Sequence, residues 1–257
     1  MRWACWRTTR CSGITEIRRK EIQMLPSESP FSCHWWATGL ENVGLGDVRP
    51  NEGTYGRYEF ERLPPLPFEL HGDFKWLASA AQYEAGSIGE EKSAENMESL
   101  VPLRKAASQI GVDLPAAFLT FMTSLDLQKR IRSSTDCYLD LCPELVQSPV
   151  GDGYLVRFLA DSQGCIFWYL YLTRDGIDHA VVSSPGFYGT EAEQWEDDPP
   201  DPTEIVYCAE SFETFMCRFW LENEIWFAAW QKTPMPNVGR RYIDLYKEMI
   251  GSSIRSI

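Results

Sequence analysis

The amino-acid sequence predicts an α+β fold, in which an antiparallel or mixed sheet is flanked by helices and preceded by a loop-rich N-terminal extension. Three observations predict it. Apolar residues recur at helical spacing in residues 97–122, strand patterns follow one another through residues 137–183, and a long apolar helix pattern begins after Ser211. Helices at both ends of a strand meander are typical of a sheet with helices on its faces. We expect this domain to occupy residues 91–257, with its last helices at the C-terminus.

Residues 1–23 form a basic leader, with six basic and two acidic side chains in a chain whose net charge is −13. The run Arg18-Arg19-Lys20-Glu21 can be encoded entirely by purines, as a ribosome-binding site would be. Either Met24 is therefore the true start, or the leader is a flexible basic tail. It lacks the apolar stretch of roughly 7–15 residues that a secretory signal requires, and no charge-free run reaches the ~18–20 residues of a membrane span. We expect a cytoplasmic protein.

Residues 24–90 are rich in proline, glycine and aromatic side chains, including Trp35, Trp36 and the proline-rich run 63–67. No helical period persists through most of this stretch. We expect a loop-rich accessory segment, with or without short strands, whose aromatic residues pack on the main domain. A short helix is expected at residues 73–84.

Two helices are expected at the start of the main domain. Apolar side chains recur at helical spacing between residues 97 and 110, with Pro102 near the first turn and Gly111 just beyond the end. Pro115 suits the start of a second helix, whose apolar face carries Phe118 and Phe121.

An antiparallel meander is expected next. Residues 137–142 alternate polar and apolar side chains, residues 154–160 and 179–183 are strand-like, and residues 165–172 form a nearly continuous aromatic and aliphatic run. Because this run is apolar on both faces, we expect it to be a central strand that is covered on each side.

A short strand at residues 204–208 is expected to precede a long helix capped by Ser211. The spacing of Trp220, Trp226 and Trp230 along this helix favours core packing over a surface that stacks on a cofactor or a sugar. Residues 238–250 are expected to form a final amphipathic helix.

Two motifs resemble the SMI1/KNR4 (SUKH) superfamily. In that family a helix ends at glycine and a Leu-Pro-x-x-aromatic-x-x-Phe helix follows, which corresponds here to Gly111, Leu114, Pro115, Phe118 and Phe121. The closing Ser-Phe-x-x-Phe helix of the family corresponds to Ser211, Phe212 and Phe215. The strand meander lies between the two motifs in the same order, and the resemblance spans residues 97–231.

The resemblance implies a sheet flanked by helices, with no cofactor and no catalytic residue set. Bacterial relatives are largely immunity proteins that bind and neutralise polymorphic toxins, often nucleases or deaminases, whereas fungal relatives are regulatory interaction proteins. The resemblance therefore favours a non-enzymatic domain that binds a basic toxin. A regulatory or scaffold interaction module without a toxin partner is the alternative.

The sequence contains no recognisable catalytic pattern. His34, His71 and His179 lie outside any nucleophile motif or metal-ligand spacing, and no G-x-S-x-G, H-E-x-x-H or phosphate-binding glycine motif occurs. An enzyme of another type would require a pocket in which an aspartate or glutamate converges with His179 or His71.

The eight cysteines include no C-x-x-C pair, and no histidine lies near the closest of the later pairs, Cys137 and Cys142. We therefore expect reduced thiols rather than zinc or disulfides. Cys165, Cys208 and Cys217 lie in apolar patterns, where a reduced cysteine packs as a small apolar side chain.

Acidic side chains concentrate in residues 175–224, which hold 13 Asp and Glu and one basic residue, Arg218. An acidic field speeds association with a basic protein and repels nucleic acid and anionic lipid, and a tryptophan among the acids would supply a buried anchor. A solvated loop is the alternative, and the proline-stiffened spacing disfavours calcium. The predicted partner-binding residues are Glu191, Glu193, Trp195, Glu196, Asp197, Asp198 and Asp201.

Overall fold

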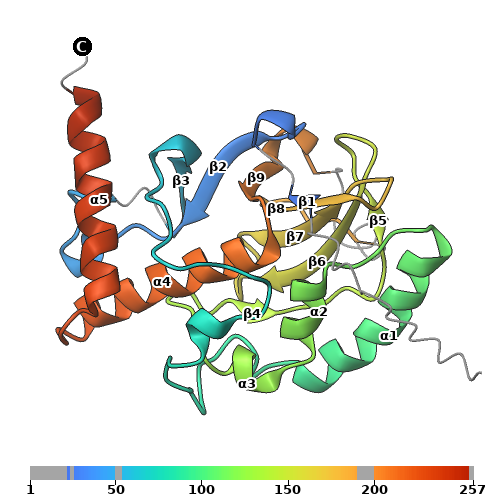
Figure 1. Ribbon diagram of the computed structural model, residues 1–257, viewed down its shortest axis with the longest axis horizontal. Coiled ribbons are helices and arrows are strands. Elements are labelled where there is room, and N and C mark those ends of the chain that lie inside the picture. Colours follow the sequence, from blue (N-terminus) through green and yellow to red (C-terminus); the bar gives the residue numbers. More distant parts are fainter. Residues whose placement is uncertain (1–21, 24–25, 50–53, 190–199, 255–257) are drawn as a thin grey trace, which may run out of the picture.

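The computed structural model describes residues 22–23, 26–49, 54–189 and 200–254. Its centre is a mixed sheet with the strand order β3-β2-β9-β8-β7-β6-β4, to which β1 adds beside β8 and β5 beside β6 (Figure 1). The strands are β1 Ile22–Gln23, β2 Ser32–Ala37, β3 Gly56–Glu59, β4 Tyr138–Leu139, β5 Val146–Gln147, β6 Tyr154–Ala160, β7 Phe167–Leu172, β8 Asp178–Ser184 and β9 Val206–Ala209. The helices are α1 Ser93–Gln109, α2 Ala116–Met122, α3 Leu125–Gln128, α4 Phe212–Trp230 and α5 Asn237–Ile254. The predicted α+β fold, with a mixed sheet flanked by helices, is confirmed.

The strand β7 lies in the interior of the sheet and is antiparallel to both of its neighbours, β6 and β8. Its residues 168–172 are all buried, which confirms the prediction of a central strand covered on both faces. Successive side chains of a strand point to opposite faces. Trp168 therefore enters the core on the helix side of the sheet, whereas Tyr169 enters a second core on the other side.

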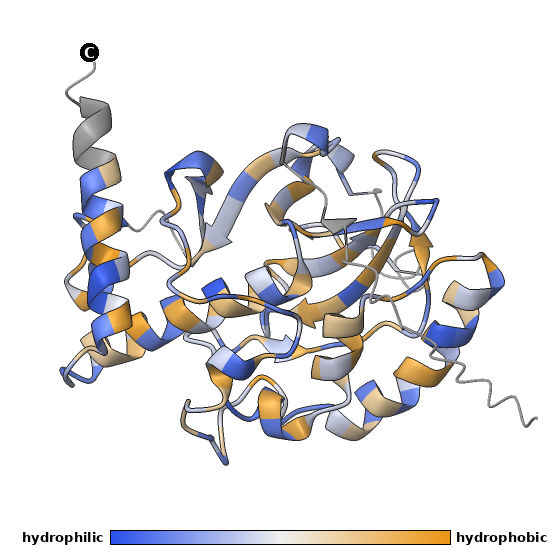
Figure 2. Ribbon diagram, in the orientation of Figure 1, coloured by the Kyte–Doolittle hydropathy of each residue, from blue (hydrophilic) through white to orange (hydrophobic). Residues whose placement is uncertain are grey.

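The helices α1, α2 and α4 lie on one side of the sheet (Figure 1). Four phenylalanine rings from α2, β6 and α4 meet there with centroid separations from 5.1 to 6.3 Å: Phe118, Phe158, Phe212 and Phe215. Figure 2 shows apolar residues along α4 and the central strands, while polar and apolar residues alternate along α5. None of the described helices is both long and apolar enough to span a membrane.

The N-terminal segment contributes to the same sheet and core. Its strand β2 pairs in parallel with β9 and in antiparallel with β3. Trp35 of β2 is 1% exposed and lies against Phe215 of α4, with 5.6 Å between the ring centroids. The segment that precedes α1 is therefore packed directly against α4, which follows it by more than a hundred residues.

The prediction of a helix at residues 73–84 is wrong, because the structure has a single 3-10 turn there, Lys75–Leu77. Phe74 adopts a left-handed backbone conformation with φ 55°, which breaks a helix at this point. Its N–H donates to the buried carboxylate of Glu213 at 2.8 Å, and the indole N–H of Trp76 donates to the same carboxylate at 3.1 Å. The backbone is thus held against the start of α4.

The position expected for Pro102 is also wrong. The helix α1 begins at Ser93, so that the proline lies in its interior rather than near its first turn. Proline has no N–H, and the carbonyl of Glu98 therefore loses its partner in the helix. Pro102 is on the exposed side, where water can hydrogen-bond that carbonyl, while Leu103 points into the core.

The helix α4 begins as predicted, because the Oγ of Ser211 accepts a hydrogen bond from the N–H of Thr214 at 3.1 Å. The prediction that all three tryptophans are in the core is wrong for Trp230, which is 61% exposed. Its ring stacks on the half-buried Trp226, with 5.4 Å between centroids and 14° between planes. Trp220 is half-buried, lying against Trp76.

Candidate functional site

Most of the predicted partner-binding loop lies outside the described residues, namely Glu191, Glu193, Trp195, Glu196, Asp197 and Asp198. Asp201 is described and exposed. Its carboxylate accepts hydrogen bonds from the hydroxyl and the backbone N–H of Thr203, at 2.7 and 2.8 Å. These two donors hold the pKa of Asp201 below its usual value. Asp201 thus caps the short helical turn Pro202–Glu204.

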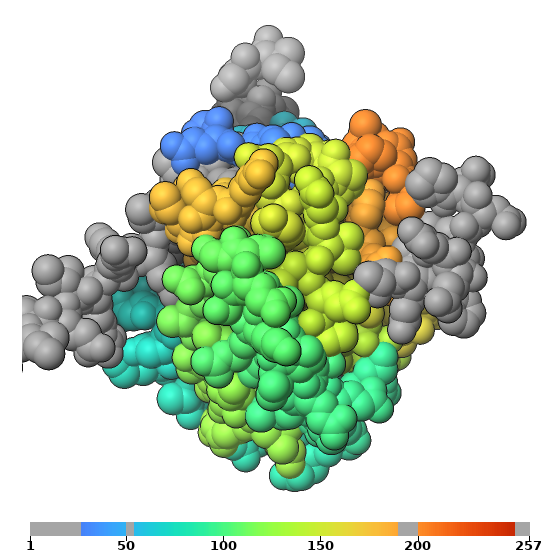
Figure 3. Space-filling view, turned by 90° about the vertical axis from the view of Figure 1, so that its right-hand side faces the viewer, coloured from blue at the N-terminus to red at the C-terminus, as the bar shows by residue number. Residues whose placement is uncertain are grey.

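A groove of about 1000 Å³ lies between two turns of the main domain. One turn joins α1 to α2 and the other, at residues 173–177, joins β7 to β8. In Figure 3 the green residues of α1 and α2 lie directly beside the gold residues around the β7–β8 turn. The turns approach closely, since a Cβ at Gly176 would be 3.2 Å from the carbonyl oxygen of Gly111. Glycine at position 176 permits this contact.

The walls of the groove are partly apolar, with Val112, Leu114 and Leu172 among the lining residues. Ile177 also lines it and is 56% exposed. His179, the second residue of β8, lines it and is 4% exposed. The volume of the groove lies at the upper end of the range that ligand pockets span in proteins.

Three aspartates line the same groove. Asp113 comes from the α1–α2 turn, Asp175 from the β7–β8 turn and Asp178 from the start of β8. Within the described part of the chain, none of the three forms an ion pair with a basic side chain. Arg104 supplies a basic side chain among the lining residues. The groove therefore brings carboxylates together with His179, the convergence that the sequence alone left open.

The pKa values of two of these aspartates shift in opposite directions. The pKa of Asp175 is lowered, because its carboxylate accepts hydrogen bonds from the Thr173 hydroxyl at 2.7 Å and the Ile177 N–H at 3.1 Å. The pKa of Asp178 is raised by burial and by the charges of Asp175 and Glu28. Its Oδ1 is buried and accepts no hydrogen bond from the described residues. A cation in the groove would stabilise the charged form of Asp178.

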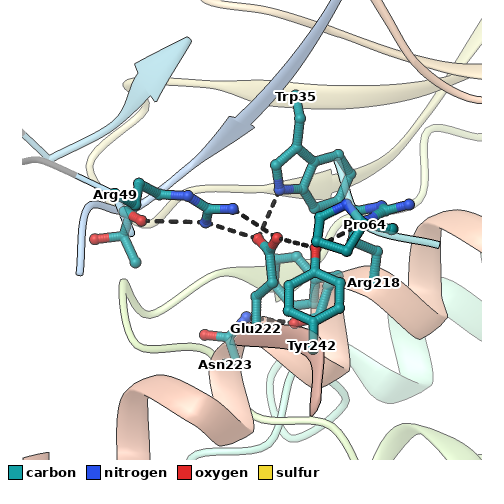
Figure 4. A network of polar contacts seen from close by, with 9 residues as sticks. Trp35, Arg49, Pro64, Arg218, Glu222, Asn223 and Tyr242 are labelled. Atoms are coloured by element: carbon teal, nitrogen blue, oxygen red, sulfur yellow. Dashed lines mark hydrogen bonds and ion pairs between the residues drawn. The ribbon is translucent and has the colours of Figure 1, made fainter. Parts of the chain in front are cut away.

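A second polar cluster is buried between β2, α4 and α5 (Figure 4). The two terminal guanidinium nitrogens of Arg49, Nη2 and Nη1, donate to the carboxylate of Glu222, at 2.6 and 2.8 Å. The indole N–H of Trp35 and the hydroxyl of Tyr242 donate to it as well, at 2.6 and 2.8 Å. Arg218 completes the cluster by donating to Tyr242 and to the carbonyl of Pro64. We call these residues the Glu222 cluster.

The geometry of the Glu222 cluster indicates that it stabilises the fold. Burial alone raises the pKa of Glu222, but the charge and hydrogen bonds of Arg49 outweigh it and hold the pKa below its usual value. The adjoining cavity, of about 20 Å³, has room for little more than one water molecule. The cluster therefore ties the N-terminal segment to α4 and α5, and it leaves no space for a substrate.

The described cysteines are free, and four of them are buried: Cys137, Cys142, Cys208 and Cys217. Burial raises the pKa of each of these thiols. Cys165, expected in the apolar pattern of a strand, is instead exposed in the turn before β7, because that strand begins at Phe167. Over the described ranges, no group of three or more His, Cys, Asp or Glu residues could hold a metal ion.

Sequence reasoning identified the acidic stretch that contains Asp175 and Asp178, but it missed the groove. The signals were present as two separate turns, at Gly111 and at Gly176, and nothing in a single sequence says that they meet. Comparisons of the chain with protein-family models, with curated proteins and with solved structures found no match.

Proposed function

We propose that this chain is a non-enzymatic protein-binding domain that neutralises a basic toxin, of the nuclease or deaminase type, by direct contact in the cytoplasm. The proposal combines the resemblance to the SMI1/KNR4 (SUKH) superfamily with the α+β fold. The motif residues Pro115 and Ser211 stand at the starts of α2 and α4, on either side of the strand meander, in the order that the resemblance implies.

The distribution of charge is the observation that carries the proposal. Most of the described arginine and lysine side chains form an ion pair with a carboxylate of the same chain, as Arg49 does in the core and Lys247 does at the surface. Asp175 and Asp178 belong to the acidic stretch 175–224 and have no such partner among the described residues. An uncompensated acidic surface accelerates encounter with a basic protein, and an enzyme that binds nucleic acid presents a basic surface.

A co-expression assay tests the proposal. The product of the gene beside this one would be expressed as the toxin, with and without this protein, and survival of the cells would be measured. We expect protection, and we expect the quadruple variant E193Q/E196Q/D197N/D198N to weaken toxin capture in a pull-down, most strongly at low salt. A matched quadruple variant, E90Q/E91Q/E95Q/E98Q at and before α1, removes the same charge elsewhere and should capture normally.

Two results would count against the proposal in different ways. A neighbouring gene whose product is not toxic would favour the regulatory or scaffold module instead. Protection and capture that are unchanged in the loop variant would contradict the docking role of Glu193, Glu196, Asp197 and Asp198, whatever the partner is.

An acid–base function of the groove is the second candidate. The observation that favours it is that His179 lines the groove together with Asp113, Asp175 and Asp178. The variant H179Q separates the two functions. If binding carries the protection, H179Q should capture the toxin and protect the cells. Capture without protection would show that His179 takes part in chemistry.

A further inference from the structure

We propose that the groove between the α1–α2 turn and the β7–β8 turn binds an extended segment of the partner protein, in which lysine or arginine residues alternate with apolar residues. The inference rests on the proposed function and names the chemistry of the partner at a place that the acidic loop does not include. It makes the groove a second contact surface, formed by the main domain itself.

The lining of the groove combines apolar and acidic side chains. The half-buried Leu114 and the exposed Ile177 offer apolar surface, while Asp113, Asp175 and Asp178 line the same groove with carboxylates. A small apolar ligand would leave the carboxylates without a partner, and a purely ionic ligand would leave the apolar surface in water. A chain that presents both kinds of side chain satisfies both.

Asp178 lies in negatively charged surroundings at the groove. Its Oδ1 is buried without a hydrogen-bond donor from the described residues, and the neighbouring charges that act on it, those of Asp175 and Glu28, are negative. Asp178 as a whole is half-buried, so a lysine or arginine of a partner can approach its carboxylate from the groove and supply the compensating charge.

The pairing of β8 beside the groove limits how the backbone of the partner segment can lie. The strand β8 pairs with β9 at Val181, Val182 and Ser183, but its first residues extend beyond β9. There β1 pairs with Asp178 and His179 in parallel. Both edges of β8 are therefore occupied beside the groove, by β1 and by β7, so an extended segment of a partner would lie across the side chains of the groove and would not add a strand to the sheet.

Binding of a defined peptide to the full chain tests the inference. The probe is a labelled ten-residue peptide in which lysine alternates with leucine, compared with one in which glutamate replaces lysine. Fluorescence anisotropy would be measured at 50 and 200 mM salt. We expect the lysine peptide to bind and the glutamate peptide not to bind. D113K should weaken binding by roughly fivefold or more, through loss of one attraction and gain of one repulsion, and I177S should weaken it by about threefold.

The matched control is D244K. Asp244 is exposed on α5, which lies at the other end of the molecule from α1 (Figure 1). The same change of charge there should alter the affinity by less than about twofold. Equal weakening by D113K and D244K would show attraction to the overall charge of the protein and would overturn the groove site. Tight binding of the glutamate peptide would overturn it too.

Two other occupants give distinct results. If R18E/R19E/K20E in the basic leader raises the affinity for the lysine peptide by fivefold or more, the leader competes for the groove and the assignment to a partner is wrong. If light scattering shows a dimer that D113K dissociates, a second copy occupies it and the assignment is again wrong. Protection of cells by D113K, with no binding of the lysine peptide to the native chain, would overturn the groove while leaving the proposed function in place.

Discussion

The Glu222 cluster gives the sharpest prediction about stability. In the variant E222L, Arg49 would keep its charge in a position that is 1% exposed, with no carboxylate to hold it. Trp35 would lose the acceptor for its indole N–H, and Tyr242 would lose the acceptor for its hydroxyl. Removing one partner of a buried ion pair costs about 3–5 kcal/mol, and each orphaned donor adds about 1 kcal/mol.

We therefore expect E222L to lower the free energy of unfolding by at least about 4 kcal/mol, a large part of the roughly 5–15 kcal/mol that holds a typical protein folded. The double variant R49M/E222L replaces both charges by apolar groups. It should be more stable than E222L, because no unpaired charge is left in the core. The conservative variant E222Q keeps one oxygen acceptor and should fold even if E222L does not.

Equilibrium unfolding in urea, followed by tryptophan fluorescence and far-ultraviolet circular dichroism, is measured for the native chain, R49M, E222L, R49M/E222L and E222Q. The first four of these proteins form a double-mutant cycle, which yields the coupling between Arg49 and Glu222. A loss below about 1 kcal/mol in E222L would refute the reasoning. A double variant whose loss equals the sum of R49M and E222L would refute it as well, since the two side chains would then act independently.

Three further predictions follow from local contacts. The pKa of Glu222 is lowered in the folded protein, so its contribution is complete above the unfolded pKa of about 4.3 and is lost as the pH falls from there through the folded pKa. The difference between the urea midpoints of the native chain and E222Q should therefore shrink as the pH falls over that range. S211A removes the cap of α4 and should cost about 1 kcal/mol in the same unfolding assay, whereas S108A, an exposed site near the end of α1, should cost less than about 0.5 kcal/mol. A thiol reagent added to the folded protein should label the exposed Cys165, so C165S should remove one equivalent of fast labelling. The variant C217S should remove none, because Cys217 is buried. Equal labelling of the two variants would contradict the positions of these thiols.

The elements that the sequence predicts well are those whose pattern is local. The strand β7 follows from a run of apolar residues, and the start of α4 follows from a serine that caps it within three residues. The error at residues 73–84 has a tertiary cause, because Glu213, more than a hundred residues away, accepts the N–H of Phe74. No local pattern could reveal this contact.

The candidate site shows the same limit. The acidic character of residues 175–224 is visible in the composition, and it includes Asp175 and Asp178 of the groove. The third aspartate, Asp113, comes from a turn some sixty residues earlier, and the contact between the turns depends on how α1 and α2 lie on the sheet. Arg49 and Glu222 are equally inconspicuous in the sequence, although they form a central contact of the fold.

The residues of the Glu222 cluster are far apart in the sequence, and this has a consequence for folding during synthesis on the ribosome. Trp35 is separated from Glu222 by 187 residues and Arg49 by 173. At about 5–20 residues per second, synthesis brings Glu222 out on the order of ten to forty seconds after these partners. Meanwhile the meander of β6, β7 and β8 can form from neighbouring strands, at a low entropic cost. During this interval the aromatic side chains of the N-terminal segment are exposed to solvent, because α4, on which they pack, has not yet been synthesised. We therefore expect the nascent chain to depend on chaperones most strongly before α4 emerges from the ribosome.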